Sequence, residues 1–252
     1  MKELGLVNRL YINRFTDFGA YLALQDGEEV LLPKGYLKGE EKEGDEVTVF
    51  VYTDSEDRPV AVTDTPHLLL DQFGVLTCKE VTSFGAFMDW GLLKDLFVPN
   101  AEMAKPMTTG QKYLIRVCVD YRSDRLIGVS KYREFIHPAP KDYVPGNEFE
   151  GLIFEKTELG FKVLLEDRYE GLVFSNEVFQ ELEIGEVRQL WVKGIIADAV
   201  RYQIGDINLK QTPFTFYNNN EDLLINQNPV TKMQQEIVNY ETFYKNNTWR
   251  HE

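Results

Sequence analysis

The chain has 252 residues, of which 43% are hydrophobic and 27% charged, so it can form one large domain or several small ones with real cores. No stretch approaches the roughly 18 consecutive apolar residues of a membrane span, and the first ten residues lack the features of a secretory signal. The formal net charge of −14 excludes a generally basic nucleic-acid binder, although a local patch of the surface can still bind phosphate.

The first 64 residues contain five short segments rich in Val, Leu, Tyr and Phe, which Gly, Asp and Pro separate. Such segments are typical of strands. We expect strands at residues 4–12, 19–24, 29–33, 47–53 and 60–64. Five strands in about sixty residues suit a small closed barrel, in which closure removes the exposed edges.

This pattern repeats along the chain. FTDFGAYL at 15–22 returns as VTSFGAFM at 81–88 and, more weakly, as KTELGFKV at 156–163. A second glycine follows the first one after twenty-five residues in every copy, with a short apolar run between them. A glycine inside a strand permits a sharp bend or bulge. We therefore assign the first glycine of each copy, Gly19, Gly85 and Gly160, to backbone geometry.

The repeats predict a mostly β fold of three tandem five-stranded barrels. We place the barrels at residues 1–64, 74–132 and 146–211, the third being degenerate. Two linkers separate them, at 64–73 and 133–146, and the second is rich in proline and favours an extended spacer. We expect residues 212–252 to form a short, partly helical C-terminal tail, with a helix after Asn228 and Pro229.

The F-G-A-F motif between strands, the apolar run and the second glycine resemble the S1 domain, an OB-fold RNA-binding barrel. EVLLPKGY, GAFMDWGLLKDLFVP and EKTELGFKVLLEDRYEGLVF, in this order, also resemble the conserved virulence factor B family, bacterial proteins of several S1-like domains followed by a winged helix. The resemblance covers about residues 3–211. It implies RNA binding and regulation of gene expression. The remaining tail is too short for a winged helix, so we expect a divergent or truncated C-terminal region.

The resemblance also implies which side chains hold RNA. Stacking rings flank the glycine of the second strand in S1 domains, which corresponds to Phe18 and Tyr21 in the first barrel and to Phe84 and Phe87 in the second. The third barrel has Leu159 and Lys162 there. The alternative is burial, because residues three apart on a regular strand face opposite ways unless a bulge intervenes.

The chain also differs from many S1 domains at the end of the third strand, where those domains carry a histidine. The chain has Pro33, Pro99 and Phe174 at these positions. Proline carries no charge and no N–H donor, so this departure weakens RNA binding in the standard manner.

The distribution of charge favours the middle barrel. Residues 1–64 carry a net charge of −7 and residues 139–211 a net charge of −6, whereas residues 65–138 carry +1. We therefore expect the RNA site on the second barrel, where an ordinary solvated surface is the alternative for each basic residue. Besides the aromatic pairs, the predicted site comprises Trp90, Arg116, Arg122, Arg125 and Lys131.

Motifs for catalysis and for cofactors are absent from the sequence. It contains no phosphate-binding glycine loop and no H-E-x-x-H pair, and its three histidines are far apart. The two cysteines lie forty residues apart, which favours a reduced cytoplasmic protein. We expect no enzyme activity, no cofactor, no metal site and no membrane contact.

Two hypotheses remain, with an unrecognised hydrolase as a distant third. The first is a regulator that binds single-stranded RNA, or single-stranded DNA, through the second barrel. The second is a scaffold for protein partners in which RNA binding has eroded, which the acidity of the other two barrels favours.

Overall fold

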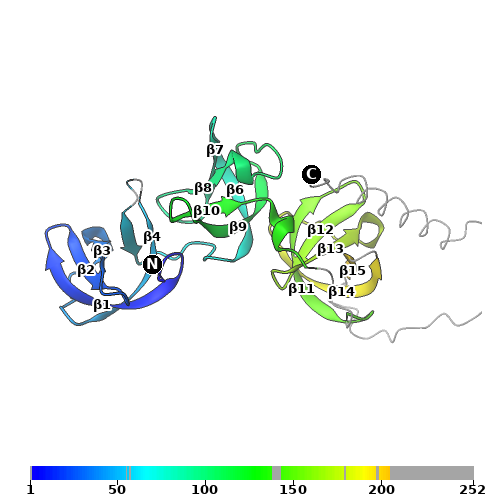
Figure 1. Ribbon diagram of the computed structural model, residues 1–252. Helices are drawn as coiled ribbons and strands as arrows, with labels where there is room; N and C mark the ends of the chain where they lie inside the picture. Colours follow the sequence, from blue (N-terminus) through cyan, green and yellow to red (C-terminus); the bar gives the residue numbers. More distant parts are fainter. Residues whose placement is uncertain are drawn as a thin grey trace, which may run out of the picture. The chain divides into compact units, whose positions relative to one another are not determined.

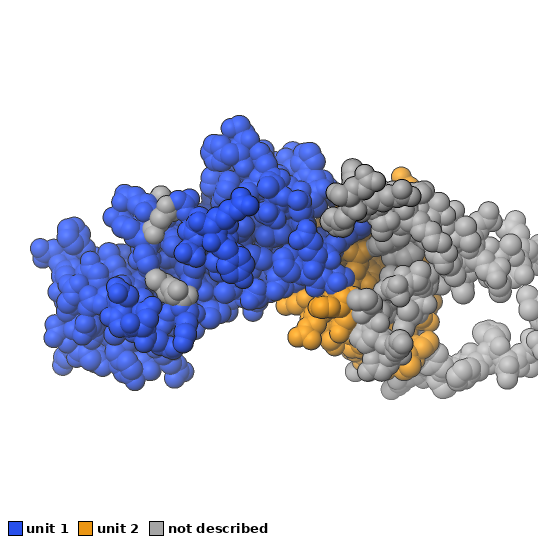
Figure 2. Space-filling view, in the orientation of Figure 1, with its two compact units in different colours: residues 1–136 blue, residues 137–252 orange. Residues whose placement is uncertain are grey.

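The computed structural model describes residues 2–204 except 55, 57, 138–142, 179 and 197–198, and only the backbone of residues 195–204. These residues form three five-stranded sheets in chain order (Figure 1). The expected mostly β fold of small OB-type barrels is confirmed. The chain divides into two compact units, Met1–Ile136 and His137–Glu252 (Figure 2). The helix expected after Asn228 lies outside the described residues.

The first barrel is closed, and its strands follow the order β1-β2-β3-β5-β4. One parallel pair, Leu31 opposite Val60, closes it. Side chains alternate along the strands, so that Ala20 and Leu22 are fully buried while Tyr21 faces outward. The strands are β1 (Val7–Thr16), β2 (Gly19–Ala23), β3 (Glu29–Pro33), β4 (Glu46–Thr53) and β5 (Pro59–Val62).

The second sheet has the order β10-β9-β6-β7-β8. Its end strands β8 and β10 lie next to each other, but no ladder joins them within the described residues. The expected closure is therefore wrong for this repeat, and the difference is small, because a single residue pair closes the first barrel. The strands are β6 (Phe73–Val81), β7 (Gly85–Asp89), β8 (Leu96–Pro99), β9 (Lys112–Asp120) and β10 (Arg125–Val129).

The third barrel is closed in the same order as the first, with a parallel pair between its third and fifth strands. It belongs to the second unit. Its strands are β11 (Glu148–Lys156), β12 (Gly160–Leu165), β13 (Tyr169–Phe174), β14 (Val187–Ile196) and β15 (Ala199–Ile204).

The turn before the second strand of each repeat has a shared geometry. In the second repeat the Thr82 hydroxyl donates to the carbonyl of Gly85 (2.9 Å), and the carbonyl of Phe84 accepts from the backbone N–H of Asn100 (3.1 Å). A Cβ atom on Gly85 would collide with the carbonyl oxygen of Val98. Gly19 meets a similar obstacle and has φ +148°, which L side chains rarely adopt. The repeated glycine therefore serves backbone geometry, as expected.

The first two repeats share one hydrophobic core. Phe50 on β4 packs against Trp90, which follows β7, with ring centroids 5.8 Å apart and an interplanar angle of 83°. Leu68, from the segment expected as a linker, is buried in the same core. Residues 64–73 are therefore a packed connection, and the two barrels form a single unit.

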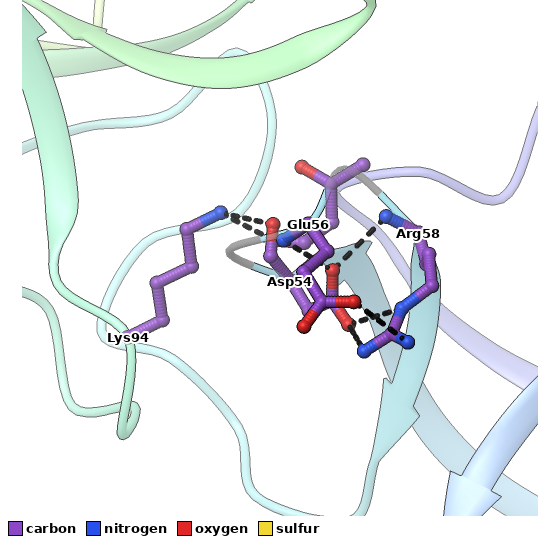
Figure 3. Close-up of polar contacts among 5 residues, drawn as sticks. Asp54, Glu56, Arg58 and Lys94 are labelled. Atoms are coloured by element: carbon purple, nitrogen blue, oxygen red, sulfur yellow. Dashed lines mark hydrogen bonds and ion pairs between the residues drawn. The ribbon is translucent and has the colours of Figure 1, made fainter.

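Polar contacts reinforce this junction at its edge. The ammonium of Lys94 donates to the carbonyls of Thr53 and Asp54, both at 2.7 Å (Figure 3). Arg58 in turn donates two hydrogen bonds to the Asp54 carboxylate and pairs with Glu56 at 2.9 Å. The turn between β4 and β5 is thus fixed to the second barrel.

Candidate functional site

Three phenylalanines meet on the outer face of the second barrel, and we call them the aromatic cluster. The ring of Phe97 lies 5.2 Å from that of Phe87 and 6.1 Å from that of Phe84, centroid to centroid. Phe84 is 62% exposed, and the other two are half-buried. An exposed group of rings is a surface on which planar ligands can stack.

Local geometry explains how Phe84 and Phe87 reach the same face. Phe87 points outward because its neighbours on β7, Ala86 and Met88, are fully buried in the core. Phe84 lies in the turn before the strand, so the alternation of strand residues does not apply to it. Both rings therefore contact Phe97 without a bulge in β7 itself.

A groove of about 530 Å³ runs beside the cluster, over the seam where β8 and β10 form no ladder. All three rings line it, together with Arg125 on β10. Tyr52 and Thr53 contribute a wall from the first barrel. The shared core of the two barrels therefore also shapes this groove.

The groove carries charges of both signs. Arg125 lines one side, and the carboxylates of Glu80 and Asp95 also line it. The carboxylate of Asp95 pairs with the ammonium of Lys79 at 2.9 Å. The hydrogen bond between them raises the pKa of Lys79. Part of the negative charge in the groove is thereby balanced.

Of the residues predicted for the site, Phe84, Phe87, Trp90 and Arg125 line the groove together. Trp90 was predicted as part of the RNA site, but it is too deeply buried to stack on a base. The indole is 2% exposed, and its N–H donates to the carbonyl of Lys94 (2.6 Å). It lies in the core of the junction and borders the groove from there.

Three predicted basic residues of the second barrel do not line the groove. The guanidinium of Arg116 lies 5.1 and 4.6 Å from the rings of Phe73 and Phe135 and pairs with Asp71 at 3.0 Å. Arg122 lies in the exposed turn between β9 and β10, and Lys131 is exposed after β10. Arg116 has a packing role, and the other two are surface charges away from the cluster.

Phe97 is the site residue that sequence reasoning missed. It lies within the apolar run LFVP at 96–99, which resembles a buried strand. The register shows otherwise, because Phe97 lies directly opposite Phe87 while its neighbours Leu96 and Val98 are buried. Alternation within that run was the signal that could have identified it.

The first barrel has a related face with a different arrangement. Phe18 is 76% exposed, but the guanidinium of Arg14 lies 4.0 Å from the ring centroid of Tyr21 and covers it. Glu29 holds Arg14 through an ion pair of 2.7 Å. Hydrogen bonds from Arg14 and, less strongly, Asn13 lower the pKa of Glu29.

The third barrel replaces the ring with a charge. Lys162 is buried and lies 3.2 Å from Glu155 and 3.8 Å from Glu170. Leu159 is half-buried in the turn that holds Phe84 in the second barrel. This face has no stacking platform at either position.

The three barrels can be compared directly along one equivalent row of each, the residues that lie opposite Tyr21, Phe87 and Lys162 on the first and third strands. A register irregularity of the first strand precedes the row in all three barrels. The rows are Arg14–Tyr21–Leu31, Glu80–Phe87–Phe97 and Glu155–Lys162–Leu172. Two adjacent rings occur only in the second of them.

Across the part of the chain that the structure describes, no three His, Cys, Asp or Glu side chains gather as a metal would require. None of the described helices has the length and apolar character needed to cross a membrane.

Comparison with known proteins finds a matching family, a similar bacterial protein and similar solved structures. The S1 domain family matches residues 4–64, which is the first barrel. Uncharacterized protein YitL of Bacillus subtilis (strain 168) is 27% identical over 194 residues, which cover 70% of this chain and 61% of YitL. The chain therefore spans about three-fifths of the length of this relative.

Several solved structures also match, including the following two. A multidomain protein with nucleic acid binding domains from Streptococcus pneumoniae is 22% identical, with a TM-score of 0.48, over 82% of this chain and 75% of that protein. Drosophila Unr CSD456 is 16% identical, with a TM-score of 0.21, over 81% of this chain and 98% of that one. The sequence of the first barrel is thus similar to the S1 domain, and the narrower resemblance to the conserved virulence factor B family stays a prediction.

Proposed function

We propose that this protein binds single-stranded RNA on the aromatic cluster of its second barrel. The observation that carries the proposal is the meeting of Phe84, Phe87 and Phe97 at an open groove that Arg125 also lines. Bases stack on aromatic rings with about 1–3 kcal/mol per base, and a guanidinium nearby attracts the phosphates. Single-stranded DNA offers the same bases and is a weaker candidate, which a parallel titration separates.

The similarity of the first barrel to the S1 domain supports the proposal. So does the local charge, since residues 65–138 escape the acidic excess of the rest of the chain. We further propose a cytoplasmic, non-enzymatic regulator of gene expression, a role that rests on the family resemblance. Lys94 and Arg125 are the basic residues that line the groove, so stacking supplies most of the affinity in this proposal.

Titration of fluorescently labelled single-stranded RNA into the full chain tests the proposal. The double variant Phe84→Ala, Phe87→Ala should lose at least about tenfold in affinity, because each lost stacking contact removes about 1–3 kcal/mol. Tyr121→Ala is the matched control, since Tyr121 is 93% exposed in the turn between β9 and β10. Binding that both variants leave unchanged would overturn the site.

A protein-interaction scaffold is the second candidate. The covering of Tyr21 by Arg14 and the ion-paired Lys162 favour it, because the first barrel has no open ring and the third no ring at all at the position of Phe87. Pull-down from nuclease-treated extract distinguishes the two functions. A partner retained without RNA, together with no measurable binding of purified chain to RNA, would favour the scaffold.

A further inference from the structure

We propose that Glu80 selects guanine among the bases that stack on the aromatic cluster. The inference deepens the proposed function and rests on it. Glu80 lies on β6 directly opposite Phe87, and both line the groove. Residues that lie opposite one another in an antiparallel pair have Cβ atoms about 4.5–5.5 Å apart. A base stacked on Phe87 therefore has its edge within reach of this carboxylate.

The carboxylate of Glu80 is available for such a contact. Its side chain is exposed, and it forms no ion pair with any residue that the structure describes. Asp95, the other carboxylate of the groove, is paired with Lys79 at 2.9 Å. Glu80 therefore keeps acceptor atoms for a ligand, while Asp95 shares its charge with a lysine.

The negative charge of the Glu80 carboxylate determines which part of a nucleic acid can bind next to it. A carboxylate repels phosphate and accepts hydrogen bonds but donates none. Next to a stacking platform it therefore faces the base edges, with the backbone directed elsewhere, for example toward Arg125. Glu80 weakens binding to phosphate in general and strengthens binding to bases that present donors.

The four bases differ in the donors of their Watson–Crick edges. Guanine presents N1–H and N2–H side by side, which matches the two oxygens of a carboxylate. Cytosine and adenine present an amino group beside an acceptor nitrogen, and uracil presents N3–H between two carbonyl oxygens. Only guanine can form two parallel charge-assisted hydrogen bonds with Glu80, and uracil is the base that it disfavours most.

The other two barrels lack this combination. At the position of Glu80 the first barrel has Arg14, which covers Tyr21. The third has Glu155, which lies 3.2 Å from the ammonium of Lys162. A carboxylate beside an uncovered ring is therefore a property of the second barrel.

The test uses the full chain and labelled oligouridylates that are identical except for one central base. The wild-type chain should bind the oligomer with central guanine about tenfold more tightly than the one with central uracil, which is within the range for a bidentate contact to a base. Glu80→Gln should reduce this preference to about twofold or less without weakening the binding of plain oligouridylate. Glu134→Gln, the same charge change at an exposed glutamate outside the groove, should leave the preference unchanged.

The outcomes separate the two proposals. Oligouridylate binding that depends on Phe84 and Phe87 without any preference for guanine would overturn the role of Glu80 and keep the proposed function. A guanine preference that survives Glu80→Gln would also overturn it. Failure of every oligomer to bind would reject the proposed function together with the inference.

Discussion

The first and second barrels carry an aromatic residue at the same place and use it differently. Tyr21 and Phe87 both face outward from the second strand, two residues after the repeated glycine. Arg14 covers Tyr21 from the adjacent strand, whereas the neighbours of Phe87 are Glu80 and Phe97. The comparison teaches that an aromatic residue in a motif becomes a stacking surface only if the adjacent strands leave its ring open.

The two barrels also differ at the edge where a barrel closes. In the first, Leu31 pairs with Val60, while in the second no ladder joins β8 to β10 among the described residues. The groove lies over this seam and takes Phe97 and Arg125 from its two sides. Incomplete closure and an open ring therefore occur in the same repeat.

The largest expected effect concerns the core that the two barrels share. Trp90→Ala should lower the free energy of unfolding by about 3–5 kcal/mol, because it removes a buried indole packed on Phe50. Denaturant unfolding measures it. Leu93→Ala is the control, since Leu93 is 88% exposed and should change stability by less than about 0.5 kcal/mol. A loss below about 1 kcal/mol for Trp90→Ala would mean that the junction does not contribute to stability.

The next largest effect is on RNA affinity, at Phe97 and at Leu31, which lies at the same position in the row of the first barrel. Phe97→Ala should weaken binding to single-stranded RNA about tenfold, because the ring that supports both Phe84 and Phe87 is lost. Leu31→Ala, at the same position of the first barrel, should change the affinity less than about twofold. Fluorescence anisotropy measures both. An equal loss of affinity in the two variants would show that the first and second barrels bind RNA equally well.

Salt dependence distinguishes the two arginines. Arg125→Ala should reduce the slope of log affinity against log salt by about 0.7, the value for one phosphate contact with a single strand. Arg14→Ala should leave the slope unchanged, because Arg14 is held by Glu29 in the other barrel. Titrations at several salt concentrations give both slopes, and a larger change for Arg14 would assign the phosphate contact to the first barrel.

The smallest effect is the titration of Glu29. Its pKa is lowered in the folded chain, so the stabilisation from its pair with Arg14 is fully present above the ordinary value of 4.5. It is lost as the pH falls below that value through the lowered pKa. Carboxyl NMR should show Glu29 titrating below the ordinary range, and Arg14→Ala should return it upward. A normal titration in the intact protein would mean that Arg14 is not paired with Glu29 in solution.

Much of this architecture could be predicted from the sequence. The spacing of the repeated glycines and the alternation of apolar residues predict small barrels, because a strand has a fixed period and a bend needs a glycine. Three of the residues predicted for the site, Phe84, Phe87 and Arg125, line the same groove, since the resemblance places the first two and charge favours the barrel that holds the third.

The remaining features depend on contacts between distant segments. Trp90 was assigned to the surface because composition cannot show that Phe50, forty residues earlier, would bury it. The covering of Tyr21 depends on a register irregularity between Ile12 and Arg14, which no local pattern reveals. Likewise, Phe97 lies in an apolar run typical of a core strand, and only its pairing with Phe87 on β7 shows that it faces outward.

The most direct test of the central claim is a photo-cross-link between the intact chain and single-stranded RNA, mapped by mass spectrometry of the modified peptides. The predicted result is cross-linking at Phe84, Phe87 or Phe97, with little at Phe18 or Tyr21. Cross-links confined to the first or third barrel, with none on the aromatic cluster, would contradict the account.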